Sequence, residues 1–302
     1  HRATLAQELD GVLKNTYFSK NKINQFLQVV INHKNVSGGS PEVFWGKANF
    51  LNIQDLGTSQ KDLLELFGNQ LFKQFGYNIH NCGSDGGTFI YIEDGVFTGN
   101  RMWQDLSKWA SNLNPRKQYE VFIITPLYYA GAYRRVGDLK KHFPFIKFFI
   151  RYGSKLENLK TDRDKSNVYW PEQLPSNPCI EAYLEKEHKF PFIARNTPTK
   201  DQVVTSPFLS HEGRRILEQQ LSIVGCKIIQ GCNKPKEVMK PLGFSNFILG
   251  FGATNVSYRN CPNNAPLALW WGNTEDGGNH FDNWYPLFPR TTNVQRVEND
   301  FE

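Results

Sequence analysis

Two adjacent carboxylates, Glu93 and Asp94, separate an apolar run from a turn that contains glycine. The run covers residues 89–92, and Thr98, Gly99, Asn100 and Arg101 follow the acids where an amphipathic stripe begins. Carboxylates can accept hydrogen bonds from the vicinal hydroxyls of a ribose, and they can help hold a Mg²⁺ whose other ligands are waters and phosphate oxygens. Backbone amides in the first turn of a helix lack partners within the helix and favour a phosphate. The segment therefore contains groups suited to both parts of a sugar phosphate.

The turn itself has features that suit a phosphate. Gly99 allows the backbone to approach a ligand closely, and the Thr98 hydroxyl and the Arg101 charge could add hydrogen bonds to those of the amides. Taken alone, the acids could simply cap a turn, and Thr98-Gly99 could be ordinary loop chemistry. The order of buried strand, acid pair, turn and helix favours the ligand site over that alternative.

Apolar runs alternate with amphipathic stripes on both sides of this segment. The strands and helices that they predict would hold the acid pair and the turn in place. The run over residues 88–93 is nearly continuous, which is typical of a strand buried on both faces. The neighbouring expectations are a helix from Ser59 to Gly76, a helical stripe over residues 102–113, a strand over 121–125, a helix over 134–143 and a strand over 146–150. The sequence therefore predicts an α/β fold, with a mostly parallel central sheet flanked by helices and additional C-terminal α+β elements. Ligands bind at the carboxyl ends of such strands, where the acid pair is expected.

The flanking regions carry weaker patterns. We expect helices over residues 5–14, 22–31 and 212–224, strands over 247–251 and 267–271, loops over 37–41 and 158–177, a turn or strand end over 44–47, and a mobile tail from 291.

Composition narrows the class of protein. A formal net charge of +6 from scattered lysines and arginines permits binding to phosphates or nucleic acid without requiring it. Five dispersed cysteines, none in CxxC spacing, argue against a zinc cluster and fit reduced thiols. We see no apolar run of membrane-spanning length and no signal-peptide pattern, so we expect a cytoplasmic protein without membrane contact.

The acid pair and turn resemble the phosphoribosyl-pyrophosphate motif of type I phosphoribosyltransferases. Glu93-Asp94 match its acidic pair, and Thr98-Gly99 match its loop. Three positions depart from the motif: Gly95 replaces an apolar residue, Phe97 is bulky where a small residue is usual, and Asn100-Arg101 stands where Gly-Thr is common. These departures weigh against ordinary base salvage, and Arg101 could replace a missing hydroxyl as a phosphate ligand.

The resemblance extends to a divergent phosphoribosyltransferase-like group found in bacterial conflict and antiphage systems. It rests on the acidic segment and on residues 59–63, 260–264, 267–272 and 284–290. It implies an N-terminal helical segment over 1–40, a phosphoribosyltransferase-like core over 41–155, a C-terminal extension over 156–290 that completes or covers the site, and a tail over 291–302. Members of the group are inferred to be effectors or sensors that act on nucleotides.

Other residues could contact the base or the rest of a substrate. Asn263 and Asn264 could hydrogen-bond a base edge, and Trp270 or Trp271 could stack on it. In the alternative, the asparagines form turns and the tryptophans lie in the core. The residues alone favour this alternative, whereas the resemblance makes the two interpretations nearly equal. Lys47 could serve a pyrophosphate loop, although an exposed lysine in a turn is the simpler interpretation. The basic helix over 134–143 is expected to present a solvated face rather than a nucleic-acid surface.

Together these features predict a phosphoribosyltransferase-like, nucleotide-binding transferase, acting as a toxin effector in antiviral defence. Glu93 and Asp94 would be catalytic, with Mg²⁺ as a possible cofactor at the same acids, while Thr98, Gly99, Asn100 and Arg101 would bind phosphate. The alternative is a non-catalytic sensor or adaptor of phosphoribosyl nucleotides. A protein partner in a defence complex is expected in either case, with nucleic acid reached through that partner.

Overall fold

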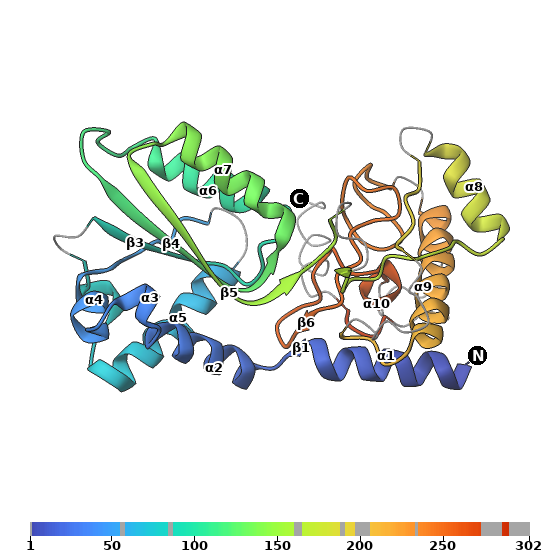
Figure 1. Cartoon of the computed structure of the whole chain (residues 1–302), viewed down its shortest axis with the longest axis horizontal. Coiled ribbons are helices and arrows are strands. Elements are labelled where there is room, and N and C mark those ends of the chain that lie inside the picture. Colours follow the sequence, from blue (N-terminus) through green and yellow to red (C-terminus); the bar gives the residue numbers. More distant parts are fainter. Residues whose placement is uncertain are drawn as a thin grey trace, which may run out of the picture. The chain divides into compact units, whose positions relative to one another are not determined.

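The chain consists of two compact units, Lys20–Leu156 and His1–Ser19 with Glu157–Glu302 (Figure 1). The computed structural model describes residues 2–54, 58–83, 87–159, 165–187, 191–196, 206–232, 235–272 and 286–289. The N-terminal segment expected over residues 1–40 is divided between the two units. The tail expected over 291–302 lies outside the described part, and so do residues 284, 285 and 290 of the stretch 284–290.

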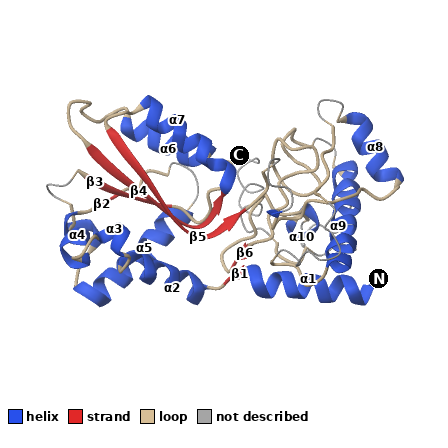
Figure 2. Ribbon diagram, viewed as in Figure 1, coloured by secondary structure: helices blue, strands red, loops and turns tan. Residues whose placement is uncertain are grey.

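The unit Lys20–Leu156 is built on a parallel four-stranded sheet, as the alternating pattern predicts. Its order is β2-β3-β4-β5, and the strands span Asn49–Phe50, Thr88–Ile92, Tyr119–Tyr129 and Ile146–Leu156. Helices α6 (Asn100–Ala110) and α7 (Tyr133–His142) cover one face. Helices α2 (Lys20–Ile31), α3 (Lys34–Ser37), α4 (Pro41–Lys47) and α5 (Ser59–Phe75) lie on the other (Figure 2). Short 3₁₀ turns occupy Ile79–Asn81 and Ala130–Ala132. This is the mixed α/β architecture expected from the sequence.

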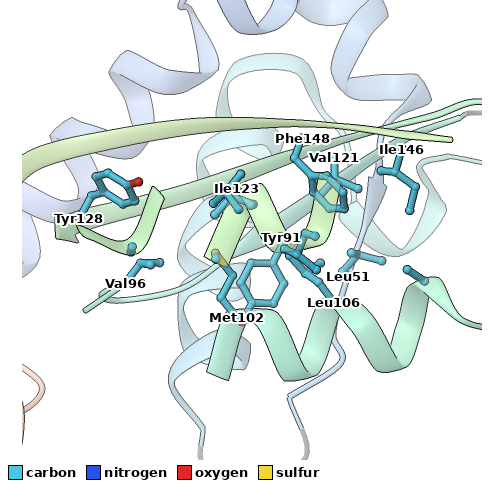
Figure 3. Close-up of a cluster of buried hydrophobic side chains, with 14 residues drawn as sticks. Leu51, Tyr91, Val96, Met102, Leu106, Val121, Ile123, Tyr128, Ile146 and Phe148 are labelled. Atoms are coloured by element: carbon cyan, nitrogen blue, oxygen red, sulfur yellow. The ribbon is translucent and has the colours of Figure 1, made fainter. Parts of the chain in front are cut away.

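Both faces of the sheet are apolar because helices bury both. On the α6 and α7 face, Tyr91 of β3 lies between Met102 and Leu106 of α6 (Figure 3). The cluster consists of Leu51, Tyr91, Val96, Met102, Leu106, Ala110, Val121, Ile123, Tyr128, Ala132, Val136, Leu139, Ile146 and Phe148. This packing holds the start of α6 against the end of β3, which is where the candidate site lies.

Two strands extend beyond the predicted ends. The expected strands over 121–125 and 146–150 continue to Tyr129 and Leu156. The extension of the first strand passes through Pro126, which cannot donate a ladder hydrogen bond. The Thr125 hydroxyl compensates locally, since it donates to Leu127 O at 2.8 Å and accepts from Leu127 N at 3.3 Å.

The helix boundaries give one confirmation and one correction. Gly76 ends α5 in the left-handed conformation, with φ 73°, and its N–H donates to Phe72 O. Residues 44–47, expected as a turn or strand end, belong to α4 instead. Pro41 occupies its first turn, where a fixed φ favours helix. Trp45 is fully buried and donates from Nε1 to Ile31 O.

The second unit contains α1 (Arg2–Thr16), α8 (Pro178–Lys186), α9 (His211–Gly231) and α10 (Leu267–Trp270). Strands β1 (Tyr17–Phe18) and β6 (Val256–Ser257) pair in parallel. The strands predicted over 247–251 and 267–271 are wrong, because the first run forms turns and the second forms α10. Glycines at 250 and 252 adopt positive φ values of 109° and 74°, which interrupt the first run. Among the described residues, none of the helices has the length and apolar character needed to cross a membrane.

A buried ionic cluster organises the second unit around α9. Glu218, with no exposed surface, accepts hydrogen bonds from Arg214 Nε at 2.8 Å and from Arg195 Nη2 at 3.0 Å. The backbone N–H of Trp170 also donates to it, at 3.1 Å. One carboxylate thus ties α9 to two segments far from it in sequence, and its charge offsets those of two buried guanidinium groups.

Candidate functional site

The acid pair stands at the carboxyl edge of the parallel sheet. Glu93 directly follows β3, and its backbone N–H donates to Ile124 O at 3.1 Å. Pairing resumes at Val96, which bridges to Tyr128 of β4. Opposite the acids, β4 carries Pro126, which has no N–H to donate. The acids therefore occupy a short interruption between two paired stretches, and the pairing on either side holds both ends of their loop.

The Thr-Gly turn opens α6 at the same edge. Gly99 is the N-cap of α6 and has φ 73°, in the left-handed region. Thr98 Oγ1 accepts a hydrogen bond from Asn100 N at 3.3 Å, and Asn100 Oδ1 accepts one from Arg135 Nε at 2.9 Å. Thr98, Asn100 and Arg101 are exposed, whereas Gly99 is buried. The exposed first turn of an eleven-residue helix thus directly follows the acid loop.

Replacing Gly99 by Ala should destabilise the protein and, if this turn holds a phosphate as the sequence predicts, should weaken the binding of a sugar phosphate. A left-handed φ costs an L-residue about 1–2 kcal/mol, and the added Cβ would lie 3.1 Å from Arg135 Cβ, so the turn would have to shift. The affinity for ribose 5-phosphate, measured by calorimetry, should fall together with the melting temperature. Gly137→Ala on α7 is the matched control, because nothing lies within 4 Å of its added Cβ. Unchanged affinity for the sugar phosphate in Gly99→Ala would remove this turn from the site.

Glu93 is buried and held by its own strand and by α6. The residue is 5% exposed, and its Oε2 lies 3.2 Å from the hydroxyl of Tyr91. The same hydroxyl lies 3.0 Å from Asp105 Oδ2 on α6. Asp94, the next residue, is only half-buried. The two acids of the pair therefore have different surroundings.

The electrostatics of Glu93 follow from this burial. The pKa of Glu93 is raised from 4.5 to about 8. Loss of hydration is the largest cause, the negative charges of Asp94 and Asp105 act in the same direction, and Arg101 and the Tyr91 hydrogen bond oppose them. At neutral pH the Glu93 carboxyl is consequently protonated for most of the time. A buried carboxyl that keeps its proton can play a different role from a neighbouring carboxyl that is more exposed.

A buried glutamine joins β2 to the end of β3. The Gln60 side chain, in the first turn of α5, accepts hydrogen bonds from the backbone N–H groups of Ile53 and Gln54, at 2.8 and 3.0 Å. Its Nε2 donates to Ile92 O at 3.3 Å, directly before Glu93. The side chain thus fixes the loop after β2 beside the acid loop. Residues 59–63 were noted in the sequence, but nothing there distinguished Gln60 from an ordinary helix residue.

Two further residues of this site were missed by the sequence patterns. Tyr91 and Glu93 are two positions apart, so a strand places both side chains on one face. Asp105 lies next to Leu106 within the apolar stripe of α6, and a lone acid in such a stripe was the available signal. Its position became meaningful only once α6 was packed against β3.

The structure does not bring every candidate residue to this edge. Lys47 ends α4 and precedes β2, whose Asn49 pairs with Phe89, so this exposed lysine lies toward the amino ends of the strands. The proposed pyrophosphate loop at Lys47 is therefore not part of the acid-loop edge.

The asparagines and tryptophans near the C-terminus belong to the second unit and have structural contacts there. Asn264 is buried and donates from Nδ2 to Phe244 O at 2.7 Å, while Asn263 O accepts from Phe244 N at 2.8 Å. Trp270 is buried, donates to Ala265 O, and packs against Trp271 with 5.5 Å between ring centroids. These contacts are those of turn-forming asparagines and core aromatic residues.

The surroundings of Glu93 and Asp94 differ from those of a magnesium site. Glu93 is buried with Oε2 directed at Tyr91, and the described part of the chain contains no group of three or more His, Cys, Asp or Glu side chains that could hold a metal ion. A hard cation usually takes six oxygen ligands. The described residues therefore do not fit a metal ion held by the protein alone.

The parallel sheet, the acid pair at its carboxyl edge and the helix opened by Thr98-Gly99 define a phosphoribosyltransferase-like α/β protein. The chain belongs to the family PRTase-CE, whose model matches residues 2–290 and so spans both units. This membership supports phosphoribosyltransferase-like, transferase activity. A comparison with curated proteins found no match, and neither did a comparison with solved structures.

Proposed function

We propose that this protein binds the 5-phosphoribosyl group of a nucleotide or activated donor and acts at its anomeric carbon, by glycosyl transfer or cleavage. The observation that carries the proposal is the placement of Glu93 and Asp94 at the carboxyl end of β3, followed within one short loop by the exposed first turn of α6. Acids and the first turn of a helix at one sheet edge match the sugar and the phosphate of one ligand.

In this proposal each group has a separate task. The first amides of α6, the Thr98 hydroxyl and Arg101 bind the 5-phosphate and hold the sugar in place. The bond from C1 to the leaving group breaks, the leaving group departs with the electron pair, and an acceptor or water bonds to C1. Asp94, half-buried beside neutral Glu93, supplies the negative charge that stabilises the oxocarbenium-like transition state. If Mg²⁺ takes part, it would arrive coordinated by the donor's own diphosphate oxygens.

The biological setting is proposed from the resemblance to the antiphage group. The protein would be an effector in a bacterial defence complex, with a protein partner and with nucleic acid reached through that partner. Association with nucleic acid should then depend strongly on salt, because phosphate contacts release counterions. Binding of DNA or RNA that does not change between low and moderate salt would count against this part of the proposal.

One observation favours the alternative of a non-catalytic sensor. Phe97 folds back over the acid loop, since a Cβ added to Gly95 would lie 2.7 Å from Phe97 Cε2. A bulky ring at this place reduces the room for a pyrophosphate leaving group or an acceptor. The protein would then bind the phosphoribosyl nucleotide and report it to its partner without turnover.

Asp94→Asn should lower the affinity for the phosphoribosyl donor about tenfold or more, because a carboxylate that accepts ribose hydroxyls contributes charge-assisted hydrogen bonds. Calorimetry with ribose 5-phosphate, the activated phosphoribosyl donor and a panel of nucleotides measures binding, and mass spectrometry of the products measures turnover. Asp10→Asn, at an exposed carboxylate on α1, is the control. Products would support the enzyme, and tight binding without products would support the sensor. Wild-type protein that binds none of these ligands would refute both.

A further inference from the structure

We infer that Tyr91 and Asp105 are positioning residues for Glu93, which fix the carboxyl oxygen that Glu93 presents to a ribose hydroxyl. This inference rests on the proposed function, because it concerns the same sugar-binding acid. Neither residue belongs to the acid pair or to the Thr-Gly turn that the motif comprises.

The positions of the three side chains leave little freedom. The hydroxyl of Tyr91 lies 3.2 Å from Glu93 Oε2 and 3.0 Å from Asp105 Oδ2. Its ring has no exposed surface and is packed between Met102 and Leu106 of α6 (Figure 3). Because the ring cannot swing away, Oε2 of Glu93 stays engaged inside the core. Oε1 is therefore the oxygen that Glu93 would present to a ribose hydroxyl.

The count of protons supports a connected chain rather than two accidental contacts. A phenol carries one hydrogen, so Tyr91 can donate to only one carboxyl group. The second contact is a hydrogen bond only when the other carboxyl carries a proton and donates it to the phenol oxygen. Glu93, whose pKa is raised to about 8 by burial and by Asp94 and Asp105, is the acid that carries this proton.

The chain links the sugar acid to the helix that opens the phosphate turn. Asp105 lies on α6, five residues after Asn100, at which that helix begins. The contact through Tyr91 therefore couples the position of Glu93 to the position of the first amides of α6. A ligand that needs both groups at a set separation gains from such coupling, because less reorganisation is required on binding.

The test compares the affinities of wild type and variants for ribose 5-phosphate and for analogues that each lack one hydroxyl. Tyr91→Phe deletes only the phenol oxygen and keeps the ring, so the core should survive. In this variant the affinity for ribose 5-phosphate should fall about tenfold, the size expected from one lost hydrogen bond to a charged or buried group. The affinity for either 2-deoxyribose or 3-deoxyribose 5-phosphate, whichever lacks the hydroxyl that Glu93 binds, should not change. Asp105→Ala should behave likewise, and Asp105→Asn, which keeps an acceptor oxygen, should recover most of the loss.

Tyr119→Phe is the matched control, since Tyr119 packs against the same core from the start of β4. If Tyr91→Phe weakens binding of all three sugars equally, the residue has only a structural role and the inference is wrong. The inference also fails by itself if the wild type prefers ribose to a deoxy sugar and Tyr91→Phe keeps that preference. If the wild type binds ribose 5-phosphate no better than both deoxy sugars, or binds none of them, the proposed sugar site fails and the inference fails with it.

Discussion

Glu93→Gln should make the protein more stable than wild type at alkaline pH. Burial and the charges of Asp94 and Asp105 raise the pKa of Glu93 from 4.5 to about 8, so between these values the folded protein keeps a proton that the unfolded chain has lost. The stabilisation from this proton is complete below the lower value and is lost as pH rises through the upper one. Glutamine is neutral at every pH and nearly isosteric, so the variant is not subject to this loss.

The expected difference is large enough to measure by chemical denaturation. One pKa unit corresponds to about 1.4 kcal/mol, so from about pH 6 to about pH 9 the variant should gain roughly 2–3 kcal/mol in free energy of unfolding relative to wild type. Glu65→Gln, at an exposed position of α5, provides a control for the loss of a carboxyl group elsewhere in the same unit. If the free energies of unfolding of wild type and Glu93→Gln change in parallel with pH, Glu93 ionises as an ordinary surface acid and does not keep its proton beside Tyr91 and Asp105.

The strands and helices that could be predicted were those with long, uniform patterns. The run over residues 88–92 predicts a buried strand because helices cover both faces of the sheet, and the side chains after Thr88 are apolar or aromatic. Gly76 ends α5 because its left-handed φ is easily reached only without a side chain. The acid pair at the strand end follows from the same reasoning, since polar residues after a buried strand must lie at the sheet edge.

The failures occurred where short runs or distant contacts decide the structure. Residues 267–270 are too few to distinguish a strand from a helical turn by period, and the backbone forms α10 after Pro266. Trp45 was predicted to lie in a turn or at a strand end, because the sequence does not reveal that its indole N–H donates to Ile31 O. The different surroundings of Glu93 and Asp94 could not be predicted at all, because they depend on Asp105 reaching the strand from α6.

Glu218→Gln should strongly destabilise the second unit. The carboxylate of Glu218 has no exposed surface and lies within 3.0 Å of both Arg195 and Arg214, which are themselves buried. Removing the charge leaves two guanidinium groups facing each other across a neutral amide, and one amide oxygen cannot accept from all their donors. Breaking a buried ion pair in this way costs about 3–5 kcal/mol.

Hydrogen exchange followed by mass spectrometry can localise this effect. Amides of α9 should lose protection by a factor of about 10² or more, as the free-energy change requires, and the overall free energy of unfolding should fall in denaturant titrations. Glu212→Gln, in the first turn of the same helix, removes an exposed carboxylate that pairs with Arg215 and should leave protection unchanged. A fall of less than about 1 kcal/mol in Glu218→Gln would mean that Glu172, 3.6 Å from Arg195 Nη1, already supplies most of the compensating charge. Glu172→Gln would then lower the free energy of unfolding more than Glu218→Gln does. Comparing the two variants therefore shows which carboxylate stabilises the cluster.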